Sequence, residues 1–179
     1  MRLTKLKTMI NMDKFLDKIS VYQFLNYMIP GTLFLVLVDI LGIYDLSLDN
    51  VFLMLFGGYC SGMVLSRIGS LLLEHYLKKW KFVVFAPYSD YKDAEAYDSK
   101  IGILSAENNM YRTFLATFLT LLILFGLNLI PCVNEFMHTS WMALIAIACL
   151  TLLFLFAYRK QTSYVRKSVE YIVSKKKEK

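Results

Sequence analysis

Histidine and cysteine are scarce in this chain of 179 residues, and their scarcity limits the chemistry that it can carry out. The two histidines, His75 and His138, fall in different connecting segments, so we do not expect them to share a site. The cysteines Cys60, Cys132 and Cys149 lack the spacing of a metal site or a disulfide framework. The sequence also contains no HExxH, GxSxG or phosphate-loop motif. We therefore predict no enzymatic activity, no bound metal and no cofactor.

Charged residues are nearly absent from four long stretches of a chain that is 57% hydrophobic. A helix needs roughly 20 apolar residues to cross a bilayer, and helices satisfy their own backbone groups in lipid. We predict an all-α membrane protein with four transmembrane helices, at about Tyr22 to Tyr44, Val51 to Leu73, Thr113 to Ile130 and Trp141 to Tyr158. Proline removes a backbone donor and crowds the preceding turn. The Pro30-Gly31 pair therefore predicts a kink and a hinge in the first helix.

Basic residues are missing from two connections between these helices, at 45–50 and 131–140. All 20 lysines and arginines lie before the first helix, from the inner end of the second to the start of the third, or after the fourth. Basic loops mark the cytoplasmic side of a membrane, so we expect both termini to be cytoplasmic. The chain then divides into an interfacial or cytoplasmic segment 1–21, transmembrane helices 22–73, a cytoplasmic helical hairpin 74–112, transmembrane helices 113–158 and a basic tail 159–179.

We expect the hairpin to consist of two helices. The second transmembrane helix should continue to Lys81, because nothing breaks it before Pro87. Ser89 is placed to cap a new helix that includes Asp98 and runs into the third transmembrane helix.

Asp39 is the only acidic residue within the body of a predicted transmembrane helix. A carboxylate there is costly unless it faces water or a partner, so it is a functional candidate. In a symmetric oligomer, Asp39 and the acidic outer connections would form rings that attract cations. The alternative is that Asp39 reaches the outer interface and is simply solvated.

Two stripes follow the second and third helices. The polar stripe of the third helix contains Asn109, Thr113, Thr117, Thr120 and Asn128. It either lines a pore or serves helix packing, because threonine can bond to its own backbone. The small residues of the second helix permit close helix packing, either within one subunit or between subunits; they are Gly58, Gly62, Ser66 and Gly69.

Basic and aromatic residues alternate where the second helix leaves the membrane, at Lys78, Lys79, Trp80 and Lys81. This pattern is typical of contact with anionic lipid, of a phosphate-bearing ligand stacked on aromatic rings, or of a protein partner. Acidic residues farther along the loop argue against duplex nucleic acid. Arg67 and Arg112 lie at the inner ends of two helices, where we expect them to pair with Glu74 or Glu107 or to contact lipid phosphate; these residues are gate or ligand candidates.

Two stretches, YQFLNYMIP at 22–30 and DSKIGILSAENNMYRT at 98–113, resemble small bacterial membrane proteins with four transmembrane helices. These proteins are effectors of antiphage defence encoded beside a nucleotidyltransferase, as in cyclic-oligonucleotide systems and the Hailong system. The resemblance implies a homo-oligomeric channel in the bacterial inner membrane that is controlled by a nucleotide or short oligonucleotide made by that enzyme. Opening would depolarise the membrane and stop growth of the infected cell. The matching residues Asn108, Asn109, Tyr111 and Arg112 would lie at the inner gate. The alternative is a non-conducting scaffold that recruits a cytoplasmic partner through the hairpin.

Overall fold

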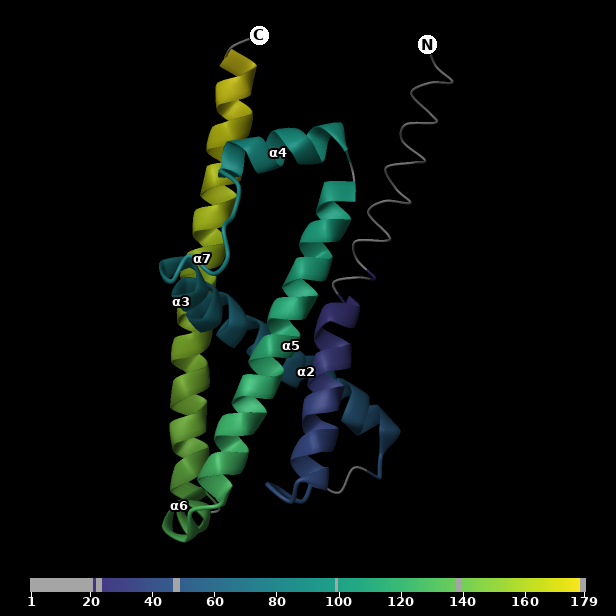
Figure 1. Ribbon diagram of the computed structural model, residues 1–179, viewed down its shortest axis with the longest axis vertical. Coiled ribbons are helices and arrows are strands. Elements are labelled where there is room, and N and C mark those ends of the chain that lie inside the picture. The colour runs from purple at the N-terminus through teal and green to yellow at the C-terminus, as the bar shows by residue number, and fades with distance from the viewer. Residues whose placement is uncertain (1–20, 22–23, 47–48, 99, 138–139, 178–179) are drawn as a thin grey trace.

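The computed structural model describes residues 21, 24–46, 49–98, 100–137 and 140–177 (Figure 1). These residues are mostly helical, and none of them forms a strand. An N-terminal helix, Phe24–Ile40, comes first. The later elements are α2 (Val51–Ile68), the π-helical turn η1 (Gly69–Leu73), α3 (Glu74–Lys79), α4 (Tyr88–Tyr97), α5 (Lys100–Asn128), α6 (Pro131–Met137) and α7 (Ser140–Lys177).

Three helical stretches are long and apolar enough to cross a membrane: Val51–Lys79, Lys100–Asn128 and Ile145–Tyr164. The first of these comprises α2, η1 and α3, whose backbone stays right-handed helical through both junctions. The N-terminal helix Phe24–Ile40 is also apolar but shorter. This architecture fits a multi-pass membrane protein.

The longest helix, α7, runs along one side of the molecule, and α5 leans toward its lower end (Figure 1). The N-terminal helix lies beside α5, while α4 crosses the opposite end of the bundle and α6 closes the lower end (Figure 1). The connection after Ile40 and the one containing α6 both lie at the lower end (Figure 1). The two connections without basic residues therefore share one end of the bundle.

The N-terminal helix packs on α2 through backbone atoms, because small residues line the contact. A Cβ atom added at Gly62 would overlap the backbone carbonyl of Tyr27, and one added at Gly31 would overlap that of Gly58. Farther along, Gly69 faces Arg112 of α5, with the arginine carbonyl 3.1 Å from an added Cβ. The small-residue face is thus buried within one chain, against two neighbouring helices.

Pro30 and Gly31, the predicted hinge, lie in the middle of this contact. The helix Phe24–Ile40 continues through both residues, and the Pro30 side chain is fully buried. Any hinge motion at this point would have to separate the N-terminal helix from Gly58 and Gly62.

The segment 74–112 differs from the expected two-helix hairpin. The α3 helix ends at Lys79 rather than Lys81, because Lys81 adopts a left-handed backbone with φ of 58°. The next helix begins after Pro87, and the expected cap Ser89 instead donates to Asp90. Asp98 is not inside that helix: its extended backbone ends α4, and its carboxylate accepts from the backbone N–H of Lys100 at 2.9 Å.

The segment expected to be a basic tail after Tyr158 is helical, because α7 continues to Lys177. This extension passes the end of α4 (Figure 1), and the Tyr171 hydroxyl of α7 donates to Asp93 of α4. The last part of the chain is therefore a structural element that holds α4.

We predict that Gly62→Ala lowers the free energy of unfolding by at least about 1–3 kcal/mol, because the added methyl group meets backbone that cannot rotate away. Gly126→Ala is the matched control, since nothing lies within 4 Å of its added Cβ. We expect the control to be neutral or stabilising by up to about 1 kcal/mol. Loss of helicity on titration with denaturing detergent measures both variants, and equal stabilities would contradict the packing described.

Candidate functional site

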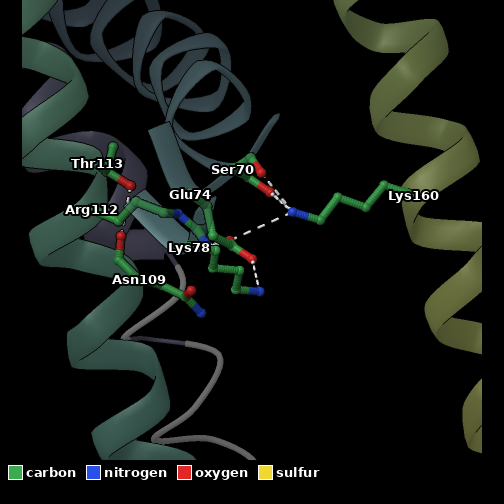
Figure 2. Close-up of polar contacts among 7 residues, drawn as sticks. All are labelled: Ser70, Glu74, Lys78, Asn109, Arg112, Thr113 and Lys160. Carbon is green, nitrogen blue, oxygen red and sulfur yellow. Dashed lines mark hydrogen bonds and ion pairs between the residues drawn. The ribbon is translucent and has the colours of Figure 1, made fainter. Parts of the chain in front are cut away.

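A carboxylate, Glu74, lies where η1 passes into α3 and is only 6% exposed. Three cations from three helices surround it (Figure 2): Lys78 of α3 at 2.7 Å, Arg112 of α5 at 2.6 Å and Lys160 of α7 at 3.5 Å. An isolated buried carboxylate would be strongly unfavourable, and close cations with good geometry offset that cost. Glu74 therefore joins α3, α5 and α7 at one point. We call these four residues the Glu74 cluster.

Lys160 reaches across from α7 to η1 as well as to Glu74 (Figure 2). Its ammonium donates to the backbone carbonyl of Ser70 at 2.6 Å and to the Ser70 hydroxyl at 2.8 Å. A π-helical turn alters the regular backbone bonding of a helix, and such turns are frequent at functional sites. Lys160 therefore links α7 to the irregular turn that precedes Glu74.

A cavity of about 1000 Å³ lies against the Glu74 cluster. This volume is at the upper end of the range for small-molecule sites. Its lining includes a single acidic residue, Glu74, and six basic ones: Arg67, Lys78, Lys92, Arg112, Lys160 and Lys167. A concave surface with this charge excess concentrates anions.

Polar and aromatic side chains share the cavity wall with these cations. The amides are Asn26, Asn108, Asn109 and Gln161, and the aromatic rings are Tyr27, Phe85, Tyr88, Tyr91 and Tyr164. Arginine and lysine donate charge-assisted hydrogen bonds to phosphate, and aromatic rings stack with bases. The wall therefore offers the groups that a nucleotide would need.

Two buried polar atoms beside the cavity have no hydrogen-bond partner among the described residues: Asn26 Oδ1 and Arg112 Nε. Asn26 is only 5% exposed, and its amide nitrogen donates to the Ala106 carbonyl at 3.0 Å. Buried polar groups are normally satisfied, and each exception calls for an explanation. Asn26 and Arg112 both line the cavity, but the two atoms themselves are buried, so a polar ligand would reach them only after a local side-chain movement.

One acidic residue of α4 offsets part of the positive charge of the cavity, because Glu95, which is not in the lining, pairs with the lining cation Lys92. Glu95 accepts from Lys92 at 2.6 Å and from the Tyr91 hydroxyl at 2.9 Å. The hydrogen bond with Glu95 raises the pKa of Lys92, so this ammonium stays charged at neutral pH. Burial raises the pKa of Tyr91, which keeps its phenol protonated.

The structure brings some predicted gate residues together and separates others. Arg67, Lys78, Asn108, Asn109 and Arg112 all line the cavity. Lys79, Trp80, Lys81 and Tyr111 are exposed and lie outside its lining.

Two members of the polar stripe of α5 are buried within this chain. Thr113 and Thr117 are 1% and 0% exposed, and their hydroxyls donate to the carbonyls of Asn109 and Thr113 within the same helix. Of the remaining members, Thr120 and Asn128 are half-buried. Two members of the stripe, Asn109 and Thr113, also contribute to the cavity lining.

Asp39 lies at the end of its helix rather than within it, because the helix stops at Ile40 and Gly42 reverses the chain with φ of 64°. Its carboxylate accepts from the backbone N–H of Leu46 at 3.0 Å. Asp39 thus caps the connection that follows.

Sequence reasoning missed the contribution of α7. Lys160, Tyr164 and Lys167 line the cavity, although they fall in the segment expected to be a basic tail without a role in the site. A helical pattern continuing beyond Tyr158 was the signal that would have placed them beside the other helices. Asn26 and Ser70, which also line the cavity, carried no comparable signal.

Comparison of the chain with protein-family models, curated proteins and solved structures finds no match. The site is therefore characterised by its own geometry, which is a basic cavity built around one buried carboxylate.

We predict that Glu74→Gln lowers the free energy of unfolding by about 3 kcal/mol, because it leaves neighbouring cations without their counter-charge. The value lies at the low end for buried pairs, since Lys78 keeps 42% of its side chain exposed. The control Glu170→Gln removes an exposed pair with Arg166 and should cost less than about 1 kcal/mol. Denaturation monitored by circular dichroism compares the two, and a similar loss for both would show that the Glu74 cluster does not stabilise the bundle.

Proposed function

We propose that this protein is a membrane-depolarising effector of antiphage defence whose gate responds to a nucleotide or short oligonucleotide bound in the basic cavity. The observation that carries the proposal is the lining of that cavity, with six basic residues against one carboxylate. The resemblance in the stretches 22–30 and 98–113 adds support, because each stretch contributes cavity residues, Asn26 from the first and Arg112 from the second.

The proposed topology has four crossings, with the N-terminal helix as the first and both termini in the cytoplasm of a bacterium. The distribution of basic residues supports it. The positions of the two connections without basic residues, at the same end of the bundle, are consistent with it (Figure 1). In this orientation the cavity opens on the cytoplasmic side, where a soluble nucleotidyltransferase would release its product.

Ligand phosphates would compete with Glu74 for its cations. Arg112 and Lys160 bind the Glu74 carboxylate from two different helices, and phosphate oxygens accept the same hydrogen bonds. Movement of either cation from Glu74 to a ligand would loosen the link between α3 and that helix. Binding energy is thereby converted into a change in helix arrangement, as control of a gate requires.

Conduction would need several copies of the chain. The buried faces of the helices are occupied by packing, and the outward side of α5 carries large apolar residues such as Leu122, which is 71% exposed. We therefore place the ion path between subunits of a homo-oligomer. Asp39 would then lie near the outer mouth.

A non-conducting scaffold is the second candidate. The observation in its favour is α4, which has no buried residue and presents Tyr97 with 95% exposure. Such a helix could receive a cytoplasmic partner.

We predict that the purified protein binds ATP or a short single-stranded oligonucleotide, and that Arg67→Gln weakens binding about tenfold, because one charge-assisted contact is worth about 1.5 kcal/mol or more. Lys100→Gln is the control, since Lys100 is exposed and outside the cavity lining. Isothermal titration at two salt concentrations measures both variants. Equal affinities for the two variants would remove the cavity from the proposal.

We predict that vesicles containing the protein lose an imposed membrane potential when the gate is open, as measured with a potential-sensitive dye. Asp39→Asn tests the outer ring, because the amide oxygen keeps the Leu46 contact while the charge is lost. A cation channel should show reduced cation preference in this variant. An intact potential with and without ATP or oligonucleotide, combined with normal binding of that probe, would favour the scaffold.

A further inference from the structure

A group of large apolar side chains lies fully in the open just after α3. Trp80 and Phe82 are 72% and 80% exposed, and the neighbouring lysines Lys79 and Lys81 are exposed as well. We call these four residues, none of which lines the cavity, the Trp80 surface. Both α3 and the apolar helical stretch Val51–Lys79 end at Lys79. The exposed rings of Trp80 and Phe82 therefore lie beyond the end of the membrane-spanning helix.

A fixed reversal of the chain holds these side chains outward. The Lys81 N–H donates to the Lys78 carbonyl at 3.0 Å, and the Phe82 N–H donates to the Leu77 carbonyl at 3.0 Å. The left-handed backbone of Lys81 makes this reversal possible. Trp80 and Phe82 are therefore presented by hydrogen-bonded backbone rather than by a free loop.

The reversal also divides the basic cluster into two parts. Lys78 turns inward, where its ammonium binds Glu74 at 2.7 Å and lies 4.0 Å from the centre of the Phe85 ring. Lys79 and Lys81 remain outside the cavity lining. Lys78 therefore contributes to the cavity, whereas Lys79 and Lys81 do not.

We propose that the Trp80 surface binds the anionic headgroup layer of the bilayer that the chain itself crosses. The apolar helix α2–η1–α3 ends directly at this surface, so its continuity with a predicted span places the surface near the edge of the bilayer. Tryptophan favours that interface, and each lysine near an anionic surface adds attraction. The proposal rests on the proposed topology only for the choice of the cytoplasmic leaflet.

Lipid is favoured over a protein partner by composition and position together. Two exposed rings that alternate with two lysines, in the order Lys79, Trp80, Lys81 and Phe82, match a layer that is apolar on one side and negatively charged on the other. Binding there would fix α3 at the membrane, so that displacements of Arg112 or Lys160 move α5 or α7 relative to a stationary Glu74. The surface would then act as the fixed side of the gate.

The test uses the full chain with Trp141→Phe, which leaves Trp80 as the single tryptophan. The protein is placed in nanodiscs of phosphatidylcholine and phosphatidylglycerol, with bromine on the acyl chains of one lipid or the other. We expect both brominated lipids to quench Trp80 fluorescence, and brominated phosphatidylglycerol to quench it more strongly. Lys79→Gln combined with Lys81→Asn should reduce this ratio to about one.

The control combines Lys100→Gln with Arg166→Gln, which removes the same charge from exposed positions elsewhere, and should leave the ratio unchanged. Strong quenching of Trp80 by aqueous acrylamide without quenching by either lipid would overturn the proposal and leave the surface to a protein partner. If both brominated lipids quench equally in the chain that keeps Lys79 and Lys81, the claim that the surface prefers anionic headgroups would be overturned. Circular dichroism verifies that each variant is folded, and ATP binding is measured separately, so failure of the cavity proposal is distinguishable.

Discussion

The arrangement depends on one carboxylate that is removed from water and held by cations from three helices. Glu74 contacts Arg112 of α5 and Lys160 of α7, so the apolar helices meet at a polar point as well as through side-chain packing. In lipid, the free energy of an apolar helix depends little on its rotation about its own axis. A buried ion cluster selects the rotation that brings its members together, and the cavity is a consequence of that selection.

Backbone contact between the N-terminal helix and α2 completes the same site from the other side. Because Gly31 and Gly62 carry no side chains, the two helices approach closely enough for Asn26 to reach the Ala106 carbonyl of α5. Asn26 would lie farther from the cavity if a larger residue separated these helices. The glycine contact and the Glu74 cluster therefore both position residues that line one cavity.

Local properties of the chain were predictable from sequence, whereas most long-range pairings were not. Length and apolarity identified the helices, and the junction of α2 with α3 follows from the absence of any breaker. The helix break at Asp98 was missed because aspartate can either occupy a helix or cap one, and only its bond to Lys100 decides. Arg112 was expected to pair with Glu74 or Glu107, and the structure selects Glu74. Lys160 was assigned to a tail, since its distance from Ser70 along the chain hides their contact.

The energetics of the Glu74 cluster limit which ligands can act on the proposed gate. Separating a buried carboxylate from a cation costs on the order of 3 kcal/mol, which corresponds to roughly a hundredfold loss of affinity. If a single phosphate displaced Glu74, the cost of separating Glu74 from its cation would cancel much of the binding free energy of the phosphate. A ligand with several phosphates could bind Arg67 and Lys167, which line the same cavity, and so offset the separation. Under the proposed function, polyanions are therefore the ligands whose binding would be coupled to helix movement, whereas binding of small monovalent anions would not be.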